Sequence, residues 1–386
     1  MPKRKGFLYD TMLDKAYIRR CILKGAEHKH NRWDVRIVLN NLDYYVDLVY
    51  EILSTFSYMP TIPRNKTIHD DSSDKDRNIG VQPFYHDGII HQVVTDTLRP
   101  VIMKSMHYWS SASIPDRGGK HSFRISKRMI QKQPNNSRYV AELDIKQFYP
   151  SIPQKEVIKA LRRRIKDKKF LQLVAVVISC DQCGQRYFYE NDTEPEEIVG
   201  DRVGLQIGFY PNQWLANFYL QEIDRFALQQ PGVKCESRYM DNINLFASNK
   251  RKLRRAVSAI MRFVIMKLKV IIKENWQIFK ICDKKHNRRH SAVGYRFARD
   301  YIVLRRRNFL RLIRQARRVK KKLDAGIAVS ARMAQSLLSR IGQLKHCNSL
   351  KALKKYIYPI GISVLKHIVK LWSRKQTARM KGAVIA

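Results

Sequence analysis

Apolar side chains recur every three to four residues over the first part of the chain. This spacing places them on one face of a helix, so residues 1–65 are predicted to be helical, ending at Pro60 and Pro63. The clearest apolar face comprises Leu42, Tyr45, Val46, Val49 and Ile52. The polar run Asp70–Arg77 that follows predicts a loop.

Two predicted strand regions each carry an acidic residue. Tyr139–Tyr149 alternates apolar and polar side chains and stops at Pro150, which predicts a strand that includes Asp144. Two short runs flank Asp241-Asn242 and predict a hairpin with these residues at its tip. A βαββ sheet can bring such distant carboxylates together as a hard oxygen site, which Mg²⁺ prefers. Taken singly, either Asp is also typical of an ordinary strand end or turn.

Further helices are predicted around these strands. Ile89–Leu98 is apolar and helical in pattern, and the glycines of Arg117–Lys120 predict a turn. Pro211 suits the first position of a helix that ends before Pro231. From Leu304 onward the pattern is helical again. The strands are therefore expected to lie between helical segments.

The segment Arg305–Lys322 is strongly basic. It contains ten Lys or Arg residues and no acid. An apolar stripe lies beneath this charge, formed by Leu310, Ile313, Ala316 and Val319. A solvated surface helix is one interpretation. Because no acidic partner balances the charge, the pattern favours a helix that lies along a nucleic-acid backbone.

The excess of positive charge extends over the whole chain. Lys and Arg number 75 against 33 Asp and Glu, a formal net charge of +42, while 44% hydrophobic residues suffice for a core. Such a surface needs a polyanion, and nucleic acid is the first candidate. An anionic membrane is the alternative, but the most apolar stretch, Leu171–Ile178, is far shorter than the ~20 residues that span a bilayer. With no secretory signal at the N-terminus, we expect a cytoplasmic protein.

The six cysteines are scattered, as is typical of reduced thiols. Cys180 and Cys183 form a lone Cys-x-x-Cys pair. A structural zinc site needs a second pair at comparable spacing, and none follows within the next forty residues. Plain thiols are therefore favoured over zinc.

Three motifs occur in an order that resembles the palm of reverse transcriptases. They are Leu143–Ser151, then Gly204–Gly208 with Asn212–Leu220, then Tyr239–Asn242. Three segments resemble the fingers of the group II intron-like branch: Arg77–Gly80, Tyr85–His91 and Ser111–His121. Two further sites, Lys273 and Val293–Tyr295, resemble the last palm motifs. The resemblance implies RNA-templated DNA synthesis, with an RNA template, a DNA primer and dNTPs as partners.

The same resemblance implies an α+β right-hand polymerase. Residues 1–65 would form an N-terminal helical segment and residues 66–135 the fingers. The palm, an antiparallel sheet plus helices, would cover 136–300, with a fingers insertion near 165–200. Residues 301–386 would form a basic helical thumb.

Site residues follow from the matched motifs. Asp144 and Asp241 would hold two divalent ions per active site, Mg²⁺ or Mn²⁺, with the Ile145 backbone and Asn242 completing the site. Lys273 would join the two aspartates as a catalytic residue that protonates pyrophosphate. The residues implied for dNTP binding are Arg117, Lys120, Phe148, Tyr149, Ile207, Gly208 and Gln213. Those implied for nucleic-acid binding are Tyr239, Met240, Gly294, Tyr295, Arg305, Arg306, Arg307, Arg311 and Arg314.

Two of these positions refine the interpretation. Tyr149 would be the steric gate that excludes a ribose 2′-hydroxyl, although a core aromatic residue is the plainer role. Ile207 stands where the family usually has Gln, and Gln213 follows Gly208 by five residues. This resembles the enzymes of diversity-generating retroelements, which copy template adenines with errors, since an apolar side chain removes a hydrogen-bonding contact near the nascent base pair. That type implies a small basic accessory protein oligomer, a structured non-coding RNA, and a bacterial or phage gene.

Asn242 is the main departure, because the family usually has a second Asp there. An amide can still offer an oxygen to a metal ion, but one negative charge is lost. The hypothesis is therefore an active polymerase, with two alternatives. One is a phage-defence reverse transcriptase, and the other is an RNA-binding polymerase homologue impaired in catalysis.

Overall fold

The computed structural model describes residues 3–70, 75–179, 192–281 and 288–382. The chain forms two compact units. Unit 1 comprises Met1–Ser122 and Tyr139–Phe279, and unit 2 comprises Phe123–Arg138 and Lys280–Ala386. Each unit is described by itself.

Helices form the N-terminal part of unit 1, as predicted for residues 1–65. They are α1 (Leu8–Met12), α2 (Lys15–Ala26), α3 (Trp33–Asn40) and α4 (Leu42–Ser54). The Asp14 side chain accepts a hydrogen bond from the N–H of Ala16 and so caps α2. Val46, Val49 and Leu53 of α4 are buried, and the predicted partners Leu42, Tyr45 and Ile52 pack against the same core. The predicted apolar face is therefore confirmed.

The polar run Asp70–Arg77 is not simply a loop, so that prediction was wrong. β1 (Arg64–Asp70) and β2 (Lys75–Val81) pair antiparallel, with Asp70 opposite Lys75. Backbone hydrogen bonds and cross-strand polar pairs stabilise this exposed hairpin. His69 and Asp76, for example, lie 2.8 Å apart between Nδ1 and Oδ1. Such a ladder needs no apolar alternation, which is why the pattern did not predict it.

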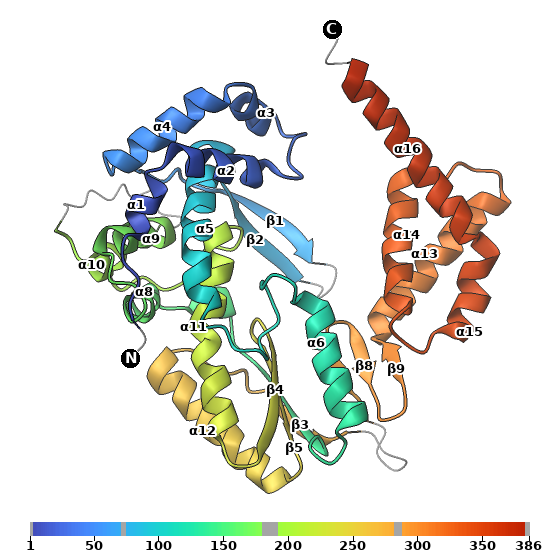
Figure 1. The fold of residues 1–386 in the computed structure, drawn as a ribbon. Coiled ribbons are helices and arrows are strands. Elements are labelled where there is room, and N and C mark those ends of the chain that lie inside the picture. The colour runs from blue at the N-terminus through green and yellow to red at the C-terminus, as the bar shows by residue number, and fades with distance from the viewer. Residues whose placement is uncertain (1–2, 71–74, 180–191, 282–287, 383–386) are drawn as a thin grey trace. The chain divides into compact units, whose positions relative to one another are not determined.

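The centre of unit 1 is a four-stranded sheet in the order β4-β5-β3-β6. Figure 1 labels three of its strands, β3, β4 and β5. The strands of this sheet are β3 (Tyr139–Asp144), β4 (Val233–Tyr239), β5 (Asn242–Ala247) and β6 (Gln277–Lys280). β5 pairs antiparallel with both β3 and β4, and Asp144 is opposite Asn242. Helices α11 (Tyr210–Gln229) and α12 (Lys250–Leu268) pack against these strands. The helix predicted from Pro211 is thus confirmed. The strand predicted over Tyr139–Tyr149 is confirmed only as far as Asp144, because Phe148 and Tyr149 belong to a short helix.

Among the remaining helices of unit 1, α5 (Ile89–Met103) and α8 (Gln154–Arg162) pack against α11. α5 also packs against α2, and confirms the helix predicted from Ile89. The other short segments are η1 (Phe84–Gly88), α7 (Phe148–Ser151), α9 (Lys168–Ser179) and α10 (Pro195–Val199). The apolar stretch Leu171–Ile178 is buried within α9. Among the described residues, no helix combines the length and apolar character needed to cross a membrane.

The turn predicted at Arg117–Lys120 is only partly a turn. Gly118 has a φ of 63° and begins α6 (Gly118–Lys127), so Gly119 and Lys120 are already helical. The positive φ at Gly118 changes the chain direction, and helical backbone resumes directly after it.

Unit 2 combines a small sheet with helices. Strands β7 (His290–Ala292), β8 (Tyr295–Phe297) and β9 (Ile302–Leu304) form an antiparallel sheet. The other elements are η2 (Arg128–Lys132), α13 (Arg306–Asp324), α14 (Ala331–Leu344), α15 (Leu350–Ala352), η3 (Leu353–Ile357), η4 (Tyr358–Ile360) and α16 (Ile362–Gly382). The basic segment is therefore a helix, as predicted.

The apolar stripe of α13 differs from the predicted one at a single position. Ile313, Ala316 and Val319 are buried as predicted, but Leu310 is 38% exposed and Leu312 is buried in its place. A strict three-residue repeat drifts around a helix of 3.6 residues per turn, so the buried stripe follows Leu312, Ala316 and Val319.

Three cysteines lie within the described residues. Cys21 and Cys235 are buried free thiols and Cys347 is half-buried. Burial raises the pKa of Cys21 to about 12, so this thiol is inert at neutral pH. Cys180, Cys183 and Cys282 lie outside the described residues. The prediction of plain thiols at the Cys-x-x-Cys pair therefore falls outside the described residues as well.

Candidate active site

Asp144 and Asp241 meet at one end of the central sheet. β3 ends at Asp144, opposite Asn242 of β5, and Asp241 directly precedes Asn242. The N–H of Ile145 donates a hydrogen bond to the carbonyl of Asp241 over 3.3 Å, which joins the two segments by backbone atoms. Burial and the neighbouring charge of Asp144 raise the pKa of Asp241. The structure therefore brings the two predicted carboxylates together.

Lys273 contacts Asp144 through both its side chain and its backbone. Its Nζ lies 2.7 Å from Oδ2 of Asp144, and its backbone N–H donates to the Asp144 carbonyl over 2.8 Å. Oδ1 of Asp144 is buried and has no hydrogen-bond partner among the residues that the structure describes. A buried, unpaired carboxylate oxygen is costly unless something binds it.

These groups fit a divalent cation. Within the part of the chain that the structure describes, no cluster of three His, Cys, Asp or Glu side chains could hold a metal ion. Mg²⁺, however, is commonly bound by one or two carboxylates, with water and substrate phosphates as its other ligands. Asp144 and Asp241 supply two carboxylates, and Asn242 could add an amide oxygen.

The hairpin tip differs from the predicted one. The pairing of Tyr239 with Asn242 leaves Met240 and Asp241 as the two-residue loop, so Asn242 is the first residue of β5 and not part of the tip. Met240 has a φ of 55°, a left-handed conformation that non-glycine residues seldom adopt. The side chain of Asn242 is exposed, and its Nδ2 donates to Oδ1 of Asp241 over 3.2 Å.

Tyr149 lies close to the carboxylates. Burial and the negative charge of Asp241 raise the pKa of Tyr149 to about 12, while Arg77 of β2 acts in the opposite direction. The ring of Phe148 is buried and its centroid is 5.0 Å from that of Tyr149. The phenol is therefore near Asp241 and near Arg77 of the β1–β2 hairpin.

The segment before α11 is joined to β2. The N–H of Gly80 donates to the carbonyl of Ile207 over 2.8 Å. Gly208 has a φ of 107°, and a Cβ there would lie 2.4 Å from the carbonyl oxygen of Gly80. Only glycine fits this approach. Gln213, in the first turn of α11, has an exposed side chain.

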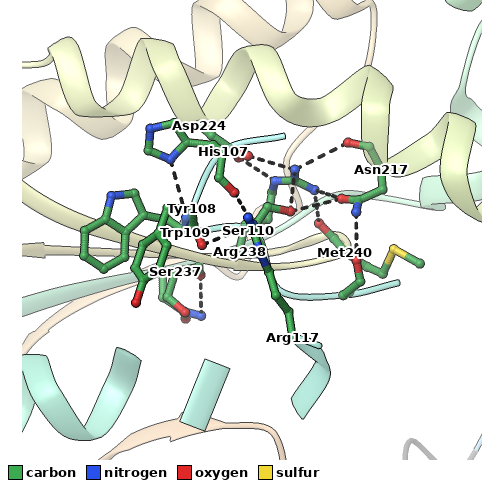
Figure 2. A network of polar contacts seen from close by, with 12 residues as sticks. His107, Tyr108, Trp109, Ser110, Arg117, Asn217, Asp224, Ser237, Arg238 and Met240 are labelled. Carbon is green, nitrogen blue, oxygen red and sulfur yellow. Dashed lines mark hydrogen bonds and ion pairs between the residues drawn. The ribbon is translucent and has the colours of Figure 1, made fainter. Parts of the chain in front are cut away.

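Arg117 makes hydrogen bonds within its own loop (Figure 2). Its Nη1 donates to the carbonyls of His107, Tyr108 and Ser110 over 2.5, 3.3 and 2.9 Å. Burial lowers the pKa of Arg117. Its Nη2 and Nε have no hydrogen-bond partner among the described residues, so these groups can still bind an anion. Lys120 is exposed in the first turn of α6.

Sequence reasoning missed one residue beside the site. Arg238 precedes Tyr239 and Met240 on β4 and is fully buried, where it pairs with Asp224 of α11. The available signal was a charged residue within an otherwise buried strand. This buried arginine could have been noticed in the sequence. Its acidic partner could not have been identified, because the chain contains many acidic residues.

The remaining predicted residues belong to unit 2. Gly294 has a φ of 87° and lies beside Tyr295, which is buried and donates through its hydroxyl to the Gln343 carbonyl over 3.0 Å. Nε of Arg305 donates to Ser291 over 3.1 Å. Arg306, Arg307, Arg311 and Arg314 lie on α13. Arg311 and Arg314, together with Arg318 and with Arg340 of α14, line a hollow between the two helices.

The sheet with two adjacent carboxylates at one end, and with helices packed on its strands, is that of a polymerase palm. Residues 68–279, more than half of the chain, match the family described as reverse transcriptase (RNA-dependent DNA polymerase). The chain therefore belongs to this family, and the predicted α+β polymerase class is confirmed.

Two curated proteins are similar over part of their length. Protein YkfC of Escherichia coli is 26% identical over 118 residues, 30% of this chain and 30% of that protein. The group II intron-encoded protein LtrA of Lactococcus lactis is 24% identical over 181 residues, 47% of this chain and 28% of that protein. These matches span less than a third of each relative. They confirm the predicted relationship to the group II intron-like branch.

Solved telomerase structures are also similar. Telomerase of Candida tropicalis in complex with a TWJ fragment of telomeric RNA has a TM-score of 0.45 at 11% identity, over 84% of this chain and 64% of that one. Telomerase of Candida albicans in complex with such a fragment has a TM-score of 0.43 at 11% identity, over 82% and 61% of the two chains.

Proposed function

We propose that this protein is an RNA-directed DNA polymerase that adds dNTPs to a primer 3′-hydroxyl, using two divalent metal ions. One observation carries the proposal most directly. Asp144 and Asp241 lie together at the end of the palm sheet, and a buried oxygen of Asp144 has no partner within the described residues. Membership of the reverse transcriptase family supports the same conclusion.

Each side chain then has a defined task. Asp144 and Asp241 hold the ions, and the Asn242 amide keeps the Asp241 carboxylate oriented through its hydrogen bond. Bound Mg²⁺ or Mn²⁺ supplies electrostatic stabilisation of the attacking and leaving oxygens. The primer 3′-oxygen loses its proton to solvent water and bonds to the α-phosphorus of the dNTP, while the bond between that phosphorus and the oxygen bridging to the β-phosphate breaks and pyrophosphate leaves. Lys273, 2.7 Å from Asp144, is positioned to give a proton to the leaving pyrophosphate.

Further residues are proposed to bind the incoming nucleotide. Tyr149, near Asp241, lies against the sugar of the incoming nucleotide and blocks a 2′-hydroxyl. Lys120 and the unpaired Nη2 and Nε of Arg117 bind the triphosphate through charge-assisted hydrogen bonds. Phe148 packs behind Tyr149, and Gly208 and Gln213 border the nucleotide near Ile207.

The proposed contacts with nucleic acid are mainly to its sugar-phosphate backbone. Tyr239 and Met240, at the hairpin that carries Asp241, contact the primer terminus. In unit 2 the arginines of α13, with Gly294, Tyr295 and Arg305 before them, bind phosphates of the template and primer strands. Neutralising several phosphates makes such binding strongly dependent on salt.

Error-prone copying in a diversity-generating retroelement is the finer proposal. Ile207 places an apolar side chain where the family usually has Gln, which supports weak discrimination at the nascent base pair. A small basic accessory protein and a structured RNA are then the expected further partners. Misincorporation opposite template adenine, compared between wild type and Ile207→Gln, tests this directly. Equal error rates for the two proteins would contradict it.

Asn242 favours a second candidate function, an RNA-binding protein without chemistry. Primer extension on an RNA template decides between the two, with wild type, Asp241→Ala and Asn242→Asp each assayed in Mg²⁺ and in Mn²⁺. Extension by wild type that Asp241→Ala abolishes supports the polymerase. Extension by Asn242→Asp alone supports the binding protein.

A further inference from the structure

Arg238 forms a buried ionic centre on β4. Its Nε and Nη2 donate to the two carboxylate oxygens of Asp224 on α11, over 2.5 and 2.8 Å, and both residues are fully buried. Burying such a pair costs nearly as much as the attraction returns, and apolar residues of similar size can be as stable. Its stability contribution alone does not account for this arrangement.

The same guanidinium reaches a second residue of α11 and two other segments (Figure 2). Nη1 donates to the side-chain oxygen of Asn217 over 2.7 Å and to the carbonyl of Met240 over 3.2 Å. Nη2 donates to Oγ of Ser110 over 3.0 Å. Asn217 in turn donates to the carbonyl of Ala112 over 2.8 Å. One side chain thus connects α11, the loop before α6, and the turn that carries Asp241.

Backbone hydrogen bonds join the loop to β4 as well. The N–H of Arg238 donates to Trp109 over 3.1 Å, and the N–H of Ser111 donates to the Arg238 carbonyl over 3.0 Å. Ser110 and Arg238 therefore pair like neighbouring strands. The loop continues directly into the turn that contains Arg117, whose guanidinium donates to the Ser110 carbonyl over 2.9 Å.

The contact with Met240 acts on a strained part of the hairpin. Met240 has a φ of 55°, and such a conformation persists only where surrounding contacts enforce it. Arg238 supplies one of these contacts through the Met240 carbonyl, one residue before Asp241. A shift of Arg238 would therefore move the Asp241 turn and the Arg117 loop together.

We propose that Arg238 is a positioning residue, which sets the distance between the metal-binding turn at Asp241 and the triphosphate-binding turn at Arg117 and Lys120. The inference rests on the proposed polymerase function. Its specific content is that the tie through Ser110 controls how a dNTP is held, and not how template and primer are held.

Ser110→Ala tests this connection, because it removes the hydrogen bond that Oγ accepts from Arg238 and the one that Oγ donates to Oδ1 of Asn217 over 3.2 Å, and it leaves the pair of Arg238 with Asp224 intact. Ser105→Ala is the matched control, since Ser105 is also buried and its Oγ donates to Ile102 over 2.8 Å, outside this network. We expect Ser110→Ala to raise the KM for dNTPs about tenfold, the loss typical of a hydrogen bond to a charged group. The kcat and the Kd for template and primer should stay unchanged.

A merely structural role predicts a different result. It would lower the active fraction and therefore kcat, with KM unchanged, and that outcome overturns the inference. Equal kinetics for Ser110→Ala and Ser105→Ala would overturn it as well.

Amide hydrogen exchange gives a readout that needs no activity. Ser110→Ala should accelerate exchange in both 107–118 and 238–242, whereas Ser105→Ala should affect neither. If the wild type does not extend a primer, the proposed function fails, and exchange still decides whether Arg238 joins the two turns. Faster exchange in 107–118 alone would contradict the inference that Arg238 couples the two turns.

Discussion

The side-chain amide of Asn242 donates a hydrogen bond to the carboxylate of Asp241, with Nδ2 and Oδ1 3.2 Å apart. Asn242→Asp replaces this bond by repulsion between two carboxylates. We expect the free energy of unfolding in EDTA to fall by about 1 kcal/mol, the interaction of unit charges near 4 Å in water. The rise of Tm on adding Mg²⁺ should become larger than in wild type.

Asn31→Asp, at an exposed position in the turn between α2 and α3, is the control for an added charge away from the site. A Mg²⁺-dependent Tm shift that is equal in both variants would argue against metal binding at Asp241. Thermal melts in EDTA and in Mg²⁺ make the measurement.

The ammonium group of Lys273 lies beside Asp144, with Nζ 2.7 Å from Oδ2. Lys273→Met leaves the two carboxylates without this cation, so we expect the metal-free protein to lose about 1.5–3 kcal/mol of stability. Mg²⁺ should restore most of the loss, while turnover stays low because the proton donor is gone. Lys267→Met, an exposed lysine of α12, should change neither quantity.

Gly208→Ala tests the joint between β2 and the segment before α11. A Cβ at a φ of 107° would lie 2.4 Å from the Gly80 carbonyl oxygen, so the backbone must move. We expect a loss of about 1–3 kcal/mol in the free energy of unfolding, together with a loss of primer extension.

Gly342→Ala is the matched control, because Gly342 lies within α14 and a Cβ there meets no atom within 4 Å. This change should stabilise the protein by about 0.5–1 kcal/mol. Urea unfolding of both variants gives the comparison, and equal effects would show that the Gly80 contact is unimportant.

Glu236 is fully buried beside the Arg238 pair, and neither of its carboxylate oxygens has a partner within the described residues. Burial and the charge of Asp224 raise the pKa of Glu236 well above 4.5, against the effect of Arg238. The unfolded chain releases this proton at lower pH than the folded chain. The stabilising contribution of the protonated form is therefore present below about pH 4.5 and is lost as pH rises toward the folded pKa.

Glu236→Gln keeps the shape without the titration. We expect it to raise Tm at pH 8 and to change Tm less at pH 5. Glu274→Gln, at an exposed position, should give no such difference between the two pH values. A destabilised Glu236→Gln protein at pH 8 would mean that the carboxylate is charged in the fold.

Tyr149 should decide the sugar that is incorporated. Tyr149→Val opens the space beside the nucleotide C2′, so we expect ribonucleotide incorporation relative to dNTPs to rise by at least about tenfold. Tyr149→Phe keeps the ring and should discriminate like wild type. Single-nucleotide extension with matched dNTPs and rNTPs provides the measurement, and unchanged selectivity in Tyr149→Val would assign the ring to the core alone.

Periodicity predicted the elements whose apolar face meets a core. α4, α5, α11 and β3 were all expected near their observed positions, since burial of one face leaves a regular signal in the sequence. The β1–β2 hairpin was missed because it is exposed and is stabilised by backbone pairing, which leaves no such signal. The Asn242 position was misplaced by one residue, since strand register decides where a hairpin turns.

The candidate site divides in the same way. Asp144, Asp241 and Lys273 could be found because the motifs that carry them occur in a recognisable order. The buried pair of Arg238 and Asp224 could not, because it depends on which of many charges meet in three dimensions. Arg117 was expected to bind phosphate, and the structure adds that its Nη1 is already used by loop carbonyls.

The joint between β2 and the segment before α11 uses only backbone atoms, the N–H of Gly80 and the carbonyl of Ile207. The side chain at position 207 takes no part in this hydrogen bond. If Ile207 borders the nascent base pair, as we propose, substitutions at this position should alter copying accuracy and leave the backbone joint in place. A set of substitutions at residue 207 offers a route to polymerases with chosen mutation spectra, built on one unchanged framework.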